Sequence, residues 1–176
     1  MSKTVTIMRG LPGSGKTHWA YKNILSLNTS AIHCSSDNFF YAKETIHARA
    51  GEMTTHGLTF SSIEKVDVYK FDVKKLGESH QYCMQKFLNA VVLEAPEIVV
   101  DNTHSRLWEY KNYVTLAEIH GYDVFIREVI CSDKETLKWV IERQTHDVPA
   151  EKILEMWFRW EEDDRSLKID PSKEPA

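Results

Sequence analysis

The sequence predicts an α/β fold in which a parallel sheet is flanked by helices, and three observations support this prediction. Short apolar, β-branched segments alternate along the chain with longer segments of helical period. A glycine-rich turn follows the first apolar segment and precedes a helical one. Near-continuous apolar runs are typical of central parallel strands, which are joined by right-handed helical crossovers.

The first elements are predicted from apolar period and from turn residues. Residues 4–8 form a buried strand, residues 15–27 a helix and residues 31–35 a second strand. Residues 37–71 are polar, aromatic and without a regular period, so we expect a long connection that contains one short helix.

The later elements have clearer end signals. Pro96 stops a helix before the apolar strand 98–100, Gly121 ends another helix in the left-handed position, and Ser132-x-x-Glu135 fits a capping box. We expect one domain over residues 1–164, closed by a C-terminal helical lid, and a flexible tail over 165–176. The helices are predicted at 72–93, 105–120, 132–144 and 149–160, and the strands at 98–100 and 124–130.

Composition places the chain among ordinary globular domains. It has 176 residues, of which 42% are hydrophobic and 27% charged, with only 7 Gly and 5 Pro. A net charge of -4 argues against a protein that coats long duplex nucleic acid, because such binding depends on neutralising phosphates. The first 36 residues nevertheless contain four basic residues and no acidic one, which indicates a segment suited to anions.

Cysteine usage and hydropathy bear on location. Cys34, Cys83 and Cys131 are odd in number and show no C-x-x-C spacing, which favours free thiols in a reducing compartment. No apolar run approaches the roughly 18 residues that a membrane span needs. We therefore expect a cytoplasmic protein that does not bind membranes.

One motif makes a specific chemical prediction. It fits G-x-x-x-x-G-K-[ST] in full and lies between a predicted strand and a predicted helix, as a P-loop does. Its glycines allow backbone N–H groups to turn toward phosphates, its lysine carries charge to the β- and γ-phosphates, and its threonine offers a hydroxyl to Mg²⁺. We therefore predict that ATP is bound by Gly10, Leu11, Pro12, Gly13, Ser14, Gly15, Lys16 and Thr17.

Two acidic residues follow predicted strands. Asp101 closes the strand 98–100 as a second Mg²⁺ ligand would, although Asp is also common there as a helix cap. Asp37 follows the second strand and would lie beside the P-loop, where it could accept a proton from an acceptor hydroxyl or serve only as a turn cap. The histidines show no metal-ligand spacing, so His18, His33 and His104 are interpreted as packing or surface residues.

A set of short motifs follows in a fixed order between residues 3 and 162. It comprises residues 10–17, Ser36-Asp37-x-Phe39-Phe40, Tyr69-x-Phe71-Asp72, Leu76-Gly77-Glu78-x-His80, Val99-Val100-Asp101-Asn102-Thr103, Trp108-Glu109, Lys111-x-Tyr113, Arg143, His146-x-Val148-Pro149, Met156 and Trp160-Glu161. The set resembles the small P-loop kinases related to the phage polynucleotide kinase domain. The resemblance implies transfer of the γ-phosphate of ATP to a 5′-hydroxyl of DNA or RNA.

The resemblance also implies roles for single residues. Asp37 takes the place of the general base, and Arg143 that of a lid arginine over the phosphates, with the lid turn at residues 146–149. Three positions depart from the pattern: Ser36 replaces an arginine, Asn38 a second acid, and Asp147 a lid glycine.

Other functions stay open from the sequence. The acceptor could be a nucleoside, a modified base in DNA or a nucleotide-sugar, and the chain could also be a nucleotide-dependent binding module without transfer. The long connection over residues 40–69 carries His47, Arg49, His56 and Lys65, which would contact an acceptor or be part of a solvated insertion.

Overall fold

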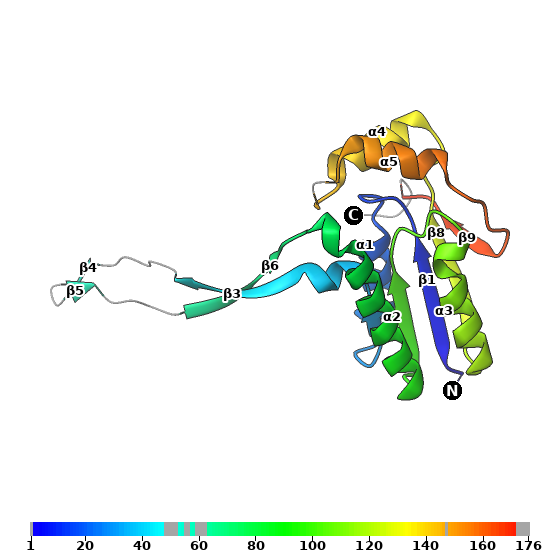
Figure 1. The fold of residues 1–176 in the computed structure, drawn as a ribbon, viewed down its shortest axis with the longest axis horizontal. Coiled ribbons are helices and arrows are strands. Elements are labelled where there is room, and N and C mark those ends of the chain that lie inside the picture. The colour runs from blue at the N-terminus through cyan, green and yellow to red at the C-terminus, as the bar shows by residue number, and fades with distance from the viewer. Residues whose placement is uncertain (1, 48–52, 55–56, 59–62, 147, 172–176) are drawn as a thin grey trace.

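A parallel sheet forms the centre of the protein in a computed structural model that describes residues 2–47, 53–54, 57–58, 63–146 and 148–171 (Figure 1). Within these residues the main sheet has five strands in the order β2-β7-β1-β8-β9, all parallel to their neighbours. The predicted parallel α/β architecture is therefore confirmed. The strands are β1 (Thr4–Arg9), β2 (Ile32–Cys34), β7 (Glu97–Asp101), β8 (Asp123–Val129) and β9 (Ser166–Ile169).

Helices cover both faces of this sheet. The helices α2 (Leu76–Val92) and α3 (Trp108–Ile119) pack on one face, where Phe87 and Tyr113 meet edge to face at 5.1 Å between ring centres. The helix α1 (Lys16–Ala20) continues as the π-helix η1 (Tyr21–Leu25) and packs on the other face. Successive side chains of a strand point to opposite faces, so β1 contributes to both cores.

The last two helices, α4 (Lys134–Arg143) and α5 (Ala150–Phe158), lie above the carboxyl ends of the strands (Figure 1). Leu137, Val140 and Ile153 form a small core with Leu11 of the P-loop, so these helices are seated on that loop. They correspond to the predicted lid. None of the helices in the described part of the chain has both the length and the apolar character needed to cross a bilayer.

The start of α4 differs from the prediction. Asp133, and not Ser132, is the N-cap, because its carboxylate accepts a hydrogen bond of 2.7 Å from the backbone N–H of Thr136. Ser132 and Asp133 are both common N-cap residues. The residue at which the helix starts decides which of the two side chains reaches the free N–H groups of the first turn.

The connection after residue 37 is more regular than predicted. It begins with the 3-10 helix η2 (Ser36–Phe40) and continues as β3 (Tyr41–His47), which pairs antiparallel with β6 (Ile63–Tyr69). This arm projects away from the main sheet (Figure 1). Antiparallel pairing is made by backbone groups, so it does not itself require a strong apolar period in the sequence. Within the described residues the short strands β4 (Met53–Thr54) and β5 (Gly57–Leu58) also pair, and η3 (Val73–Lys75) leads into α2.

The predicted flexible tail over residues 165–176 is wrong for residues 166–169, which form β9 beside β8. The Nζ of Lys168 lies 2.7 Å from the buried carboxylate of Glu128, and Ile169 belongs to the core on which α1 packs. A buried carboxylate needs partners, and here the end of the chain supplies them. The predicted domain boundary at residue 164 would therefore separate β9 from the rest of the sheet. Residues 172–176 lie outside the described part.

Candidate functional site

The P-loop joins β1 to α1 in a conformation that requires glycine at two positions. Gly13 has a φ of 84° and Gly15 a φ of 93°, in the left-handed region that side chains rarely adopt. A Cβ on Gly13 would lie 2.2 Å from the backbone oxygen of Val140 in α4. The backbone N–H of Ser14 donates to the oxygen of Leu11 at 3.0 Å and closes the turn. The loop is therefore compact and lies at the N-terminus of a helix, as a phosphate-binding loop does.

Thr17 and Asp101 lie together beside this loop. The Thr17 hydroxyl donates to Oδ2 of Asp101 at 2.6 Å, although the two residues are 84 positions apart. Nε2 of His33 lies 3.2 Å from the same oxygen. The predicted pair of Thr17 and Asp101 is therefore brought together, whereas His33, interpreted from the sequence as a packing or surface residue, is a direct neighbour of the site.

The Asp101 carboxylate is buried but keeps its charge. Burial would raise its pKa, but the hydrogen bond with His33 and the charge of Lys16 outweigh burial, so the pKa lies below the ordinary value. Its second oxygen, Oδ1, is buried and has no hydrogen-bond partner among the described residues. A charged carboxylate with a free oxygen next to a threonine hydroxyl suits a hard divalent cation such as Mg²⁺.

The segment after β2 is tied to the end of β7. Ser36 donates to Oδ1 of Asn102 from its backbone N–H at 2.9 Å and from its hydroxyl at 2.7 Å. Asp37 follows on η2, and its side chain is 42% exposed. The carboxylate that was predicted as a base is thus held at the same sheet edge as Asp101 and stays partly exposed.

Asp37 also has a neighbour in the lid turn. Nε2 of His146 lies 3.8 Å from Oδ2 of Asp37, an ion-pair distance when the ring is protonated. The ring of Tyr69, at the end of β6, is 4.3 Å from the His146 ring. Neither residue was predicted to meet Asp37, because they approach it from parts of the chain that only folding brings together.

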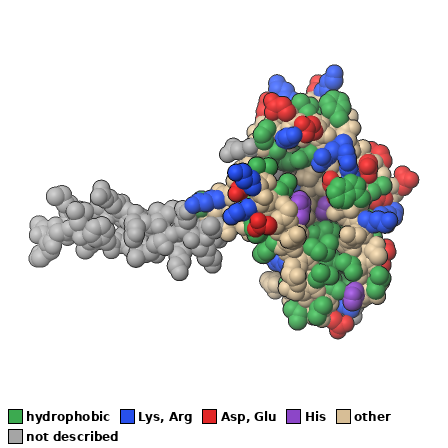
Figure 2. All heavy atoms as spheres, viewed as in Figure 1, with side chains coloured by type: hydrophobic (Ala, Val, Ile, Leu, Met, Phe, Trp, Pro, Cys, Tyr) green, Lys and Arg blue, Asp and Glu red, His purple; other side chains and the backbone are tan. Residues whose placement is uncertain are grey.

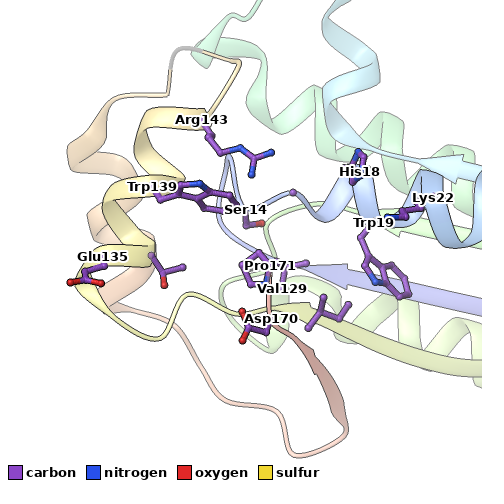
Figure 3. Close-up of a pocket in the computed structure, with 13 residues that line it drawn as sticks. Ser14, His18, Trp19, Lys22, Val129, Glu135, Trp139, Arg143, Asp170 and Pro171 are labelled. Carbon is purple, nitrogen blue, oxygen red and sulfur yellow. The ribbon is translucent and has the colours of Figure 1, made fainter. Parts of the chain in front are cut away.

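A cavity of about 520 Å³ opens between the P-loop, α1, η1, α4 and the end of β9 (Figure 3). Figure 3 shows Arg143 and Trp139 reaching from α4 toward the loop, with His18 and Trp19 on the opposite side. The Arg143 guanidinium carbon lies 4.1 Å from the centre of the Trp139 ring, which holds it over the cavity by a cation–π contact. The volume is in the range of small-molecule sites.

The cavity also involves residues that sequence reasoning missed. Asp170 and Pro171, within the segment predicted as a tail, line its wall after β9, and His18 lines it from α1. Figure 2 shows histidine side chains near the centre of the face that it views, below α4 and α5. Of the basic residues in the arm, Arg49 and His56 lie outside the described residues, and for His47 and Lys65 the backbone alone is described.

The chain is similar in sequence to known proteins. A family model described as "AAA domain" matches residues 5–162. NEDD4-binding protein 2 of Homo sapiens is 33% identical over 152 residues, which cover 86% of this chain and 7% of that protein. The chain spans 7–11% of the length of the curated relatives that it matches.

Solved structures with a similar fold include kinases. A gluconokinase from Sinorhizobium meliloti superimposes with a TM-score of 0.54 at 11% identity, covering 97% of this chain and 84% of that one. A chain of the Pnkp1/Rnl/Hen1 RNA repair complex gives a TM-score of 0.56 at 15% identity, covering 90% and 44%. The predicted P-loop NTPase fold is thereby confirmed.

Proposed function

We propose that this chain, which belongs to the AAA domain family, is an ATP-dependent phosphotransferase whose acceptor is the 5′-hydroxyl of DNA or RNA. One observation carries this proposal. Thr17 and Asp101 are joined by a 2.6 Å hydrogen bond beside the P-loop, and the open carboxylate of Asp37 is tied to the same sheet edge through Ser36 and Asn102.

The nucleotide would be bound by the loop and the lid. The backbone of residues 10–17 and the Lys16 ammonium would hold the phosphates of ATP, with the nucleoside in the adjoining cavity. Thr17 and Asp101 would hold Mg²⁺, which when bound neutralises charge on the phosphate oxygens. Arg143, held by Trp139 at the end of α4, would stabilise the charge on the γ-phosphoryl oxygens during transfer.

Asp37 would act on the acceptor. The acceptor oxygen forms a bond to the γ-phosphorus while the bond from that phosphorus to the β,γ-bridging oxygen breaks, and ADP leaves. The hydroxyl proton passes to the Asp37 carboxylate. A base at this position has to be reached by an acceptor, and the partial exposure of Asp37 supports that.

The acceptor is supported by resemblance to polynucleotide kinases, but one observation favours a second candidate. Ser36 stands where phage polynucleotide kinases carry an arginine, and its hydroxyl is already engaged by Asn102. A serine hydroxyl carries no charge, so Ser36 does not replace the charge that an arginine offers to an acceptor phosphate. A nucleoside, a modified base in DNA or a nucleotide-sugar is the second candidate.

The test is transfer from γ-labelled ATP to 5′-hydroxyl DNA, 5′-hydroxyl RNA, nucleosides and nucleotide-sugars in parallel. We expect label in an oligonucleotide, and none with Lys16→Ala, which should also bind ATP weakly. Asp37→Asn should bind ATP normally and lose about 10²–10⁴ in rate, the usual contribution of a general base. Label in a small molecule alone would favour the second candidate, and ATP binding without any transfer would indicate a binding module.

A further inference from the structure

The Asp37 carboxylate lies between two residues to which the proposed chemistry gives no role. Tyr69 approaches from the base of the arm, and His146 from the turn between α4 and α5. The two rings also contact each other, with 4.3 Å between their centres and a tilt of 43°. Asp37, Tyr69 and His146 therefore form one cluster, which we call the base cluster.

Tyr69 is a fixed member of the base cluster. Its ring packs against those of Phe40 and Tyr41, at 6.0 Å and 5.2 Å between centres. The pKa of its hydroxyl is raised, first by burial and then by the negative charge of Asp37, with which it shares a hydrogen bond. Tyr69 thus keeps its proton and offers a neutral donor to the carboxylate.

His146 is tied to the lid. The side-chain oxygen of Gln144 accepts hydrogen bonds from the backbone N–H groups of His146 at 3.1 Å and of Val148 at 2.9 Å, which sets the shape of the turn. The turn begins directly after α4, whose last residue is Arg143. Nδ1 of His146 is buried with no partner in the described residues, whereas Nε2 is directed to Asp37.

We infer that His146 is a positioning residue that orients the Asp37 carboxylate when the lid is seated over the P-loop. A half-exposed aspartate on a 3-10 helix has several rotamers, and contacts on two sides reduce that freedom. Because His146 and Arg143 belong to the same lid segment, the position of the lid sets both the charge over the phosphates and the orientation of the base. The inference rests on the proposed function in taking Asp37 as the base.

The first experiment measures kcat, KM for the acceptor and Kd for ATP in His146→Ala, His146→Gln and His120→Ala. We expect His146→Ala to lower kcat about tenfold, as contacting residues in one network commonly do, with unchanged affinity for ATP. Gln carries an N–H donor at a reach similar to that of Nε2, so His146→Gln should recover part of the rate. His120 is exposed at the end of α3, and His120→Ala should match the wild type.

The second experiment places His146→Ala in the Asp37→Asn background under single-turnover conditions. If His146 acts through Asp37, the additional substitution should leave the residual rate unchanged. The same tenfold loss in both backgrounds, or a weakened affinity for ATP in His146→Ala, would overturn the inference. Failure of the proposed function looks different, because the wild type would then transfer phosphate to none of the acceptors, whereas a normal rate of His146→Ala overturns only the positioning role.

Discussion

At the scale of single residues, His104 shows how burial can make stability depend on pH. Its ring lies beside β1, where Nδ1 is 2.9 Å from the backbone oxygen of Met8. Burial lowers its pKa from 6.5 to about 4, so the folded protein keeps the ring neutral. The unfolded chain takes up a proton at higher pH than the folded one. The contribution of His104 is therefore fully present above pH 6.5 and is lost as the pH falls toward 4.

We predict that His104→Asn flattens this dependence. Asn tolerates the left-handed backbone at this position, where φ is 49°, and it does not titrate. Its melting temperature should be lower than that of the wild type at neutral pH, but should fall less between pH 6.5 and 4. Thermal unfolding over that range is the measurement, with the exposed His120→Asn as the control. Equal slopes for wild type and His104→Asn would mean that folding does not lower the pKa of the ring.

At the scale of elements, the N-cap of α4 determines how firmly the lid helix begins. The hydrogen bond from the Thr136 N–H lowers the pKa of Asp133, which marks a carboxylate engaged with the helix start. Asp133→Ala should lower the melting temperature by about 2–4 °C, the usual effect of losing a cap in a domain of this size. Ser132→Ala is the matched control and should have a much smaller effect. A larger effect of Ser132→Ala would restore the cap that the sequence indicated.

The strand β9 allows a second test at this scale, because neighbouring side chains differ in burial. Ile169 is 7% exposed and packs under α1, whereas Leu167 is 55% exposed. Ile169→Ala should reduce the free energy of unfolding by about 2–4 kcal/mol, since it leaves a cavity, and Leu167→Ala by less than about 0.5 kcal/mol. Denaturant unfolding measures both. Similar small losses would mean that the end of the chain does not belong to the core.

At the scale of the whole molecule, Arg9 joins parts of the chain that are far apart in sequence. It is fully buried between the rings of Tyr110 and Trp160, at 5.1 Å and 4.9 Å. Its guanidinium donates to Glu128 at 2.7 Å and to the backbone oxygens of His104 and Glu161. One side chain thus connects β1, β8 and the segment that follows α5.

We predict that Arg9→Ala destabilises the fold by about 3–5 kcal/mol, because it removes one of the two cations that pair with the buried Glu128 carboxylate. Lys3 lies near the other end of β1 and pairs with Glu94, which is 77% exposed. Lys3→Ala should cost less than about 1 kcal/mol, as exposed ion pairs do. Urea unfolding compares the two variants. Similar losses of unfolding free energy for Arg9→Ala and Lys3→Ala would mean that Lys168 alone is a sufficient partner for Glu128.

The sequence by itself determined the features whose causes are local. The P-loop was predictable because its glycines, Lys16 and Thr17 are contiguous and its left-handed positions admit little else than glycine. The alternation of strands and helices was predictable from period, and Gly121, with a φ of 74°, ends its helix as expected. The carboxyl ends of parallel strands meet at one edge of a sheet, so the strands that precede Asp37 and Asp101 were expected to bring both residues to that edge.

The tertiary structure decided the features that depend on partners distant in the chain. His33 meets Asp101 across 68 positions, and no local signal distinguishes it from a packing histidine. The same holds for His146 beside Asp37, and for β9, whose Lys168 is drawn in by the buried Glu128. Burial makes these contacts strong, because an unpaired charge inside the protein is costly, and burial is a property of the assembled fold and not of any short segment.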